Sequence, residues 1–316
     1  MITKAVLGID TSNYTTSLAI CSLEGEIIEN IKIILPVKAG ERGLKQSDAV
    51  FSHIKNFEVV SNILKKKHEK YDYVAIGYSG YPRDCDGSYM PCFLVGKMVA
   101  ELISSLYDIP SFAFSHQSGH IQAAMYSAKM PNQNEFIAFH VSGGTTEILH
   151  VIPDITGFDI NLIGGSVDLH AGQAIDRIGV KMGMQFPCGR ELEQCALQNI
   201  KIIPKVKICV EGYRCNLSGL ENLALSLYEK TDDVCLVSAY TVKFISETIK
   251  QLCVNLRKEF NDTCILFAGG VMSNSIIKDE LKNTFSNVFF SEPQFSTDNA
   301  SGIALLALKS FKNKEG

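Results

Sequence analysis

The sequence lacks the apolar run of about 20 residues that a membrane-spanning helix needs, and its first residues do not resemble a signal peptide. The apolar stretch after Lys4 covers only residues 6–9, which is too short for the apolar part of a signal. The ten cysteines include no Cys-x-x-Cys pair, so they are expected to be reduced thiols that act mostly as small core residues. We therefore expect a cytoplasmic protein.

No charge of one sign dominates the chain. It has 30 Lys and Arg against 34 Asp and Glu, a net charge of −4, which argues against a protein that binds nucleic acid by charge alone. An RNA substrate brought in with a partner's help is compatible with this charge. With 316 residues, 46% of them hydrophobic, the chain is long enough for two packed domains that need no disulfide for stability.

Two segments of the sequence share one pattern: an apolar strand, a loop of Ser, Thr and Gly, and a returning strand with threonines. They are residues 5–20 and 136–149. Any two β-hairpins share such features, but a third segment, residues 263–271, adds a buried-type strand that runs into a Gly-Gly turn. Glycine lets the backbone approach a phosphate, and loop N–H groups and helix N-termini supply positive dipole. This layout predicts the actin, Hsp70 and sugar-kinase superfold.

The predicted fold class is therefore α/β, with two RNase H-like domains and a cleft between them. We place the domain boundary near Pro110, where a helix ends and a strand begins, which gives domains of residues 1–112 and 113–316. The second domain is expected to hold the metal and nucleotide site, and Ser273 or Asn274 is expected to cap a helix. Apolar residues with helical spacing predict further helices over residues 59–70, 93–106 and 237–260.

The most distinctive candidate site is a pair of histidines. His116 and His120 are spaced i and i+4, so they lie on one face of a helix, close enough to bind a single ion. Two histidines at this spacing also form ordinary surface pairs, so a ligand from elsewhere is needed. We choose Asp298, because polar residues there precede an apolar helix over residues 303–308. Two imidazoles and one carboxylate suit iron or zinc with positions left open for a substrate.

A zinc peptidase of the His-Glu-x-x-His type is disfavoured. Its mechanism needs a Glu next to the first His as general base, and this chain has Gln117 there, which cannot take a proton.

Together these motifs resemble the TsaD/Gcp family of tRNA threonylcarbamoyladenosine transferases, once called O-sialoglycoprotein endopeptidases. The resemblance extends over almost the whole chain and keeps seven short motifs in order. They are residues 8–12 (Gly-Ile-Asp-Thr-Ser), 116–120 (His-x-x-x-His), 141–144 (Val-Ser-Gly-Gly), 171–176 (Ala-Gly-Gln-Ala-Ile-Asp), 217–220 (Leu-Ser-Gly-Leu), 269–274 (Gly-Gly-Val-x-x-Asn) and 297–300 (Thr-Asp-Asn-Ala).

The resemblance implies a role for each matching residue. His116, His120 and Asp298 match the metal ligands. Asp10 and Ser142 are the candidate catalytic residues, since an acid at the end of the first strand of this superfold commonly holds phosphate-bound water or Mg²⁺; a plain helix cap is the alternative for Asp10. His140 is a candidate fourth ligand or, equally, a hydrogen-bonded core residue. The implied nucleotide and substrate contacts are Val141, Ser142, Gly143, Gly144, Thr145, Asp176, Gly189, Gly269, Gly270 and Asn274.

The resemblance also implies an activity. Family members transfer a threonylcarbamoyl group from its adenylate to the adenosine next to the anticodon of certain tRNAs, and partner proteins complete the active complex. The implied cofactors are one divalent metal ion (Fe or Zn), an ATP- or AMP-type nucleotide or threonylcarbamoyl-adenylate, and a candidate Mg²⁺. The carbamoyl carbon of a mixed anhydride is already activated, so the protein need only position it and stabilise developing charge.

The loops depart from the family's pattern. Residues 10–16 lack two carboxylates of the usual Glu-Thr-Ser-Cys-Asp-Glu-Thr, and residues 79–84 replace a Gly-Pro-Gly segment. Residues 168–170 (Asp-Leu-His) replace Asp-Asp-Ala, residues 186–189 (Phe-Pro-Cys-Gly) replace Tyr-Pro-Gly-Gly, and Thr145 stands where a His is common. These changes indicate a diverged paralogue.

Two alternatives to transfer onto tRNA follow from the changed loops. One is a non-catalytic relative that binds nucleotide and metal and acts as a partner or regulator. The other is a small-molecule carbamoyltransferase or a kinase of the same superfold, for which Asp84, Asp86 or Asp168 would have to act as the base.

Overall fold

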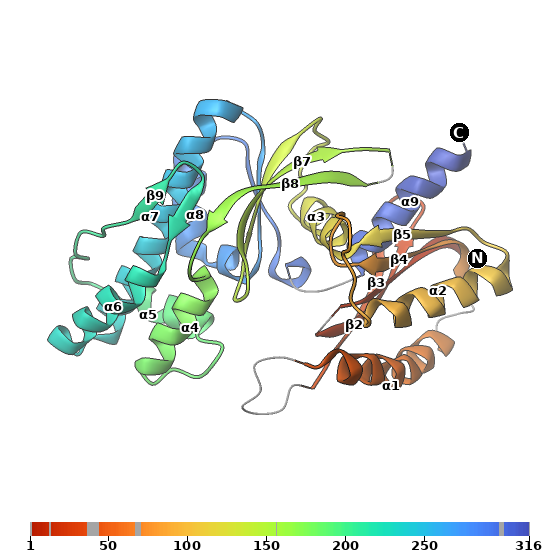
Figure 1. Ribbon diagram of the computed structural model, residues 1–316, viewed down its shortest axis with the longest axis horizontal. Helices are drawn as coiled ribbons and strands as arrows, with labels where there is room; N and C mark the ends of the chain where they lie inside the picture. The colour runs from red at the N-terminus through yellow and green to blue at the C-terminus, as the bar shows by residue number, and fades with distance from the viewer. Residues whose placement is uncertain are drawn as a thin grey trace. The chain divides into compact units, whose positions relative to one another are not determined.

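The structure is a computed structural model that divides into two compact units (Figure 1). Unit 1 comprises Met1–Tyr126, Pro153–Ile160 and Gln294–Gly316, and unit 2 comprises Ser127–Ile152 and Asn161–Pro293. The residues described are 2–12, 14–36, 44–66, 71–155, 157–296 and 300–315. Within them, no helix is long and apolar enough to cross a membrane.

Unit 1 is built on a five-stranded sheet with the order β3-β2-β1-β4-β5. The central strand β1 pairs antiparallel with β2 and parallel with β4, and β5 continues the parallel side. The apolar run that begins at residue 5 predicted a strand, and β1, whose residues 5–11 are buried, confirms it. The strands are β1 (Thr3–Thr11), β2 (Thr15–Ser22), β3 (Ile27–Ile34), β4 (Tyr71–Tyr81) and β5 (Ser111–Ser115).

Helices cover both faces of this sheet (Figure 1). On one face, Leu7 and Ile9 of β1 form a core with Val60 of α1 and Ala100 of α2. On the other face α9 lies very close to the strands, because a Cβ on Gly8 would come within 2.5 Å of the backbone nitrogen of Ala304. The helices of unit 1 are α1 (Gln46–Lys65), α2 (Phe93–Tyr107), α3 (His116–Ser127) and α9 (Ser301–Glu315).

Unit 2 repeats the strand order of unit 1. Its sheet runs β12-β11-β6-β7-β8-β10-β9, and the part β8-β7-β6-β11-β12 corresponds to β3-β2-β1-β4-β5. The directions also agree, since β6 pairs antiparallel with β7 and parallel with β11. The predicted duplication is confirmed. The strands are β6 (Phe136–Val141), β7 (Thr146–Pro153), β8 (Phe158–Ser166), β9 (Cys209–Glu211), β10 (Arg214–Asn216), β11 (Ile265–Ala268) and β12 (Val288–Phe290).

The core of unit 2 forms between this sheet and the long helix α7. Phe139 of β6 stacks on Phe267 of β11 with ring centroids 5.0 Å apart, and Phe244 and Ile249 of α7 belong to the same buried cluster. The helices are α4 (Ala171–Lys181), α5 (Gly189–Leu197), α6 (Ser218–Thr231), α7 (Val234–Phe260), η2 (Gly270–Ser273) and α8 (Ser275–Thr284). The short helix η3 (Pro293–Phe295) spans the boundary between the units in the chain.

The division into units differs from the predicted boundary between residues 112 and 113. β5 begins at Ser111, but it pairs with β4 and therefore stays in the first sheet. The C-terminal helix α9 also belongs to unit 1, because it packs on β1, β2 and β4. The chain thus enters unit 2 near the end of α3 and returns to unit 1 at residues 153–160 and again from residue 294 onward, which composition alone does not reveal. The helix predicted over residues 59–70 begins earlier, at Gln46.

Candidate functional site

The two predicted histidine ligands lie side by side in the first turns of α3. Their Nε2 atoms are 2.9 Å apart, and the ring centroids are separated by 4.4 Å. The His116 side chain is 21% exposed, so the pair is reachable from solvent. The prediction that His116 and His120 share one helical face is confirmed.

Asp10 lies beside the histidine pair. Its carboxylate is fully buried at the end of β1, and Oδ1 is 2.9 Å from Nδ1 of His116. Ser79 of β4 donates its hydroxyl hydrogen to the same oxygen. The other oxygen, Oδ2, is buried and receives no hydrogen bond from the described residues. Because β1 and β4 are parallel neighbours, their carboxyl ends bring Asp10 and Ser79 to one edge of the sheet.

The start of α3 is held by a polar cluster that the sequence did not reveal. Ser115 caps the helix by accepting a hydrogen bond from the Ser118 N–H at 3.0 Å. Both hydroxyls donate to Oδ2 of Asp84, that of Ser118 at 2.9 Å, and the Gln117 N–H donates to the Pro82 carbonyl at 3.1 Å. The carboxylate of Asp84 therefore fixes α3 and is engaged, which does not suit the alternative role as a kinase base. A Ser-x-x-Ser pattern at the helix start was the available signal.

The described residues supply two of the ligands that a metal ion at this site would need, the imidazoles of His116 and His120. Two imidazole nitrogens about 2.1 Å from one ion and at a right angle to each other would be about 3 Å apart, close to the Nε2–Nε2 separation here. Among the described residues, no group of three or more His, Cys, Asp and Glu side chains is placed to hold an ion. Asp298 lies outside the described residues. His140 belongs to β6 of unit 2, opposite Glu147 in the strand register, and its role as a ligand remains a prediction.

A third histidine, which sequence reasoning missed, organises the loop after β1. His53 of α1 is fully buried; its Nε2 donates to the Ser12 carbonyl at 2.8 Å, and its Nδ1 is 2.8 Å from the Thr16 hydroxyl. Asn56 donates to that hydroxyl oxygen at 2.9 Å, so the Thr16 hydroxyl hydrogen points to Nδ1. Burial lowers the pKa of His53. A single histidine in an amphipathic helix gives no sequence signal for this role.

In unit 2, the predicted phosphate loop connects β6 and β7. The loop is closed by a hydrogen bond of 2.7 Å from the Ser142 N–H to the Thr145 carbonyl. A Cβ on Gly143 or Gly144 would meet nothing within 4 Å, so the side on which a side chain would project from either glycine is not filled by the described residues. The backbone there is open to a ligand, as a phosphate cradle requires.

Two glycines bring other elements against this loop. Gly172, at the start of α4, donates to the Ser142 carbonyl at 3.1 Å, and a Cβ on it would come within 2.7 Å of that oxygen. Gly269 has φ +99, and a Cβ on it would come within 2.2 Å of the Val141 carbonyl oxygen. The structure therefore brings the predicted residues Val141–Thr145, Gly269 and Gly270 into one region of unit 2.

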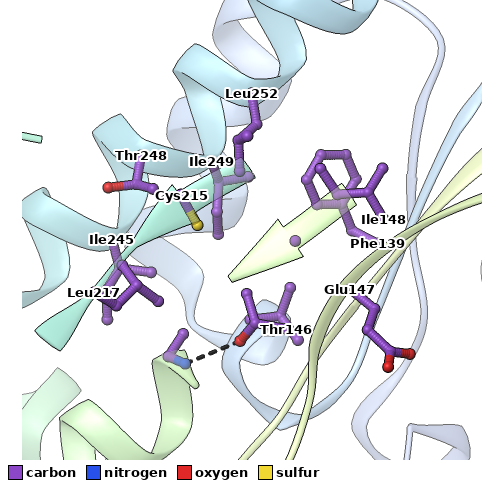
Figure 2. A pocket seen from close by; sticks show the side chains of 13 residues that line it. Phe139, Thr146, Glu147, Ile148, Cys215, Leu217, Ile245, Thr248, Ile249 and Leu252 are labelled. Carbon is purple, nitrogen blue, oxygen red and sulfur yellow. Dashed lines mark hydrogen bonds between the residues drawn. The ribbon is translucent and has the colours of Figure 1, made fainter. Parts of the chain in front are cut away.

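The N-terminus of α4 is largely bonded within the protein. Besides Gly172, the Ala171 N–H donates to the Thr146 hydroxyl at 2.9 Å, the hydrogen bond drawn in Figure 2. Because these first N–H groups already have acceptors within the protein, the N-terminus of α4 has fewer free donors for an anion than the sequence suggested. The N–H groups of the loop are therefore the better candidates for binding phosphate.

Two of the remaining predicted nucleotide contacts, Asp176 and Asn274, also have partners within the protein. Oδ1 of Asp176 accepts a hydrogen bond from the Cys188 N–H at 2.8 Å, and burial raises the pKa of Asp176. Asn274 caps α8 by accepting from the Ile277 N–H at 3.1 Å, which confirms the predicted cap. A Cβ on Gly189, at the start of α5, would meet nothing within 4 Å. Their contacts with a nucleotide remain predictions.

Asp168, a candidate base under the kinase alternative, is a structural anchor. It accepts hydrogen bonds from the N–H groups of Leu169 and Leu217 at 2.6 and 2.8 Å and from the Ser218 hydroxyl at 2.6 Å. Desolvation opposes its ionisation, but the hydrogen bonds from the Ser218 hydroxyl and the backbone hold the pKa of Asp168 well below its usual range. A carboxylate so stabilised is a poor base.

A small apolar pocket lies in the core of unit 2 beneath the β6–β7 hairpin. Its open space is about 10 Å³, room for one water at most, so it is not a nucleotide site. In Figure 2 the carboxylate of Glu147 points away from the apolar side chains. The pocket is lined by Phe139, Val141, Thr146, Glu147, Ile148, Gly165, Ala171, Cys215, Leu217, Ile245, Thr248, Ile249 and Leu252.

The duplicated strand order and the glycine-containing loop define the class of fold, the actin, Hsp70 and sugar-kinase superfold, as predicted. Solved structures agree. HypF from T. kodakarensis matches with a TM-score of 0.59 and 12% identity over 98% of this chain and 48% of its own. Component A of (R)-2-hydroxyglutaryl-CoA dehydratase from Acidaminococcus fermentans has a TM-score of 0.55 and 16% identity, over 99% and 100% of the two chains. At such low identity these likenesses show the fold alone.

The family of this chain follows from a match to a protein-family sequence model. The model of TsaD, tRNA N6-adenosine threonylcarbamoyltransferase, matches residues 49–305, and the chain belongs to this family. The membership confirms the family resemblance and supports a transferase with a role in carbamoyl transfer.

Proposed function

We propose that the protein transfers a threonylcarbamoyl group from threonylcarbamoyl-adenylate to the adenosine next to the anticodon of tRNA, in a metal-dependent reaction. The observation that carries this proposal is the histidine pair of α3, whose Nε2 atoms face each other at 2.9 Å in a chain of the threonylcarbamoyltransferase family. A surface pair has no reason to be backed by a buried carboxylate, as His116 is by Asp10.

His116 and His120, together with Asp298, would hold one iron or zinc ion. Bound there, the ion would supply a Lewis acid for the carbonyl oxygen of the donor. The contact between α9 and α3 supports the choice of Asp298, because the helix that follows it packs on the helix of the two histidines through Gly302 and Gly119.

The loop between β6 and β7 would bind the phosphate of the adenylate through the backbone of Ser142, Gly143 and Gly144. In the reaction a bond forms between the carbamoyl carbon and N6 of adenosine, while the bond from that carbon to the phosphate oxygen breaks. AMP leaves with the electron pair, and N6 loses one proton. The N–H groups that bind the phosphate would therefore also stabilise the leaving group. Asp176, Gly189 and Asn274 would contact the ribose and base, and Mg²⁺ would accompany the nucleotide.

Partner proteins would assist binding of tRNA in the cytoplasm. The net charge of −4 supplies little attraction for RNA. An exposed apolar stripe along α2 supports a protein partner: its members are spaced by four residues and each is about half exposed or more. They are Leu94, Met98, Leu102 and Leu106.

A second candidate is a non-catalytic relative that binds nucleotide and metal and regulates another protein. It is favoured by the loss of two carboxylates from the first loop and by Thr145 in place of a histidine. A small-molecule kinase is less well supported, because the carboxylates of Asp84 and Asp168 are engaged in hydrogen bonds to α3 and α6.

The test is to purify the chain, measure bound metal, and incubate it with threonylcarbamoyl-adenylate and unmodified tRNA, with and without candidate partner proteins. We expect modified tRNA from the wild type and from His150→Ala, whose histidine pairs with Glu135 on the surface of unit 2. Modification should disappear in His116→Ala. Metal and adenylate binding without transfer under any combination would overturn the proposal and support the second candidate.

A further inference from the structure

We propose that Asp10 is a positioning residue that fixes the tautomer of His116 and aims its Nε2 at the metal position. Oδ1 of Asp10 lies 2.9 Å from Nδ1 of His116. A carboxylate oxygen accepts, so Nδ1 carries the hydrogen and Nε2 keeps its lone pair. That Nε2 faces Nε2 of His120, the second predicted ligand. In many metal sites a carboxylate orients a ligating histidine through its other ring nitrogen in this way.

The carboxylate is well placed for this task because it cannot move freely. Asp10 is fully buried on β1, and the Ser79 hydroxyl of the neighbouring strand donates to the same oxygen that receives the His116 hydrogen. The Phe93 ring, with its centroid 5.8 Å from that of His116, restricts the imidazole on another side. Two donors on one oxygen and a packed ring define a single orientation of His116.

This role differs from the one expected for an acid at the end of the first strand, namely to hold phosphate-bound water or Mg²⁺. Oδ1 is occupied by His116 and Ser79, so this oxygen acts through the histidine. The inference concerns Oδ1 alone, because Oδ2 receives no hydrogen bond from the described residues. The inference rests on the proposed function for the presence of a metal, but the tautomer of His116 is a property of the metal-free chain and can be measured without one.

The first test is the ¹⁵N spectrum of the histidine rings in the full chain, metal-free at pH 8. We expect His116 of the wild type to be protonated on Nδ1. Asp10→Asn should shift His116 toward the tautomer protonated on Nε2, while Ser79→Ala, which removes the other donor to Oδ1, should leave Nδ1 protonated. A wild-type His116 protonated on Nε2 would overturn the inference even if the variant fails to fold.

The second test is the affinity for Zn²⁺ alone, by competition with a chelator. Asp10→Asn should bind Zn²⁺ about 10–100-fold more weakly than the wild type. Ser79→Ala keeps the carboxylate and loses only its second donor, so it should bind Zn²⁺ more tightly than Asp10→Asn does. Equal affinity of Asp10→Asn and wild type would overturn the inference and leave the proposed function standing. If wild type and His116→Ala bind equally, the metal part of the proposed function fails, and the ring spectra alone decide the role of Asp10.

Discussion

Gly302 of α9 lies directly against the carbonyl oxygen of Gly119 in α3. A Cβ on Gly302 would be 1.8 Å from that oxygen, and a Cβ on Gly119 would be 2.8 Å from the Ile303 side chain. The contact joins the first turn of the C-terminal helix to the turn that carries His116 and His120. It is possible only because both residues lack a side chain.

The first prediction concerns this contact. Gly302→Ala should lower the free energy of unfolding by about 1–3 kcal/mol or more, because the new methyl group meets a backbone atom that cannot rotate away. Zn²⁺ affinity should fall with it, since α9 and α3 must separate. The control is Gly219→Ala in α6, where a Cβ meets nothing within 4 Å and stability should stay the same or rise. Urea unfolding of the wild type and both variants measures these changes in stability. Equal urea midpoints for Gly302→Ala and the wild type would contradict the prediction.

The second prediction concerns pH and His53. Burial lowers the pKa of His53 in the folded chain, so between that pKa and about 6.5 the unfolded chain binds more protons than the folded one. The free energy of unfolding should therefore fall as the pH drops below about 6.5. In His53→Gln, which cannot titrate, this part of the slope should be missing. Chemical unfolding of both proteins at pH 7.5 and 5.5 tests this prediction. If the free energy of unfolding changes equally with pH in the wild type and in His53→Gln, His53 does not contribute.

The third prediction concerns Asp168. Asp168→Ala should destabilise the protein by about 2 kcal/mol, because it leaves the N–H groups of Leu169 and Leu217 without their acceptor. The pKa of Asp168 is lowered on folding, so its contribution is complete above about pH 4 and is lost as the pH falls toward the folded pKa.

The difference in free energy of unfolding between the wild type and Asp168→Asn should therefore begin to shrink below about pH 4 and decrease further as the pH falls. Asp86→Asn, on the exposed loop after β4, is the matched control, and its free energy of unfolding at pH 7 should lie within about 0.5 kcal/mol of the wild type. A difference between wild type and Asp168→Asn that grows as the pH falls would count against the anchoring role.

The fourth prediction separates binding from packing in the loop of unit 2. Gly143→Ala should change stability by less than about 0.5 kcal/mol, because nothing lies within 4 Å of the new Cβ. AMP binding should weaken by about tenfold if the loop backbone contacts the phosphate, a loss of about 1.4 kcal/mol. Gly172→Ala should instead lower stability, since its Cβ would meet Ser142 and Gly143. Calorimetric titration with AMP and thermal melts check both, and unchanged AMP affinity in Gly143→Ala would exclude the cradle.

Much of the fold could be predicted from local patterns. The β1–β2 and β6–β7 hairpins, the helices that begin at Phe93 and Val234, and the shared face of His116 and His120 all follow from the period of apolar residues or from spacing along a helix. The cap of α8 by Asn274 is equally local, because its partner is three residues away.

The contacts between polar groups could not be predicted in the same way, because they depend on the tertiary fold. Asp10 and His116 are 106 residues apart in the chain, and Asp10 and Ser79 are 69 apart. His53, Asp84 and Asp168 look like ordinary polar residues in the sequence; their partners come from other strands and helices. Periodicity determines which face of an element is buried, but the pairing of side chains depends on strand order and on how closely helices approach. Local sequence patterns are therefore enough to predict the repeated elements and the histidine pair, whereas the packing of the sheet places Asp10 behind that pair.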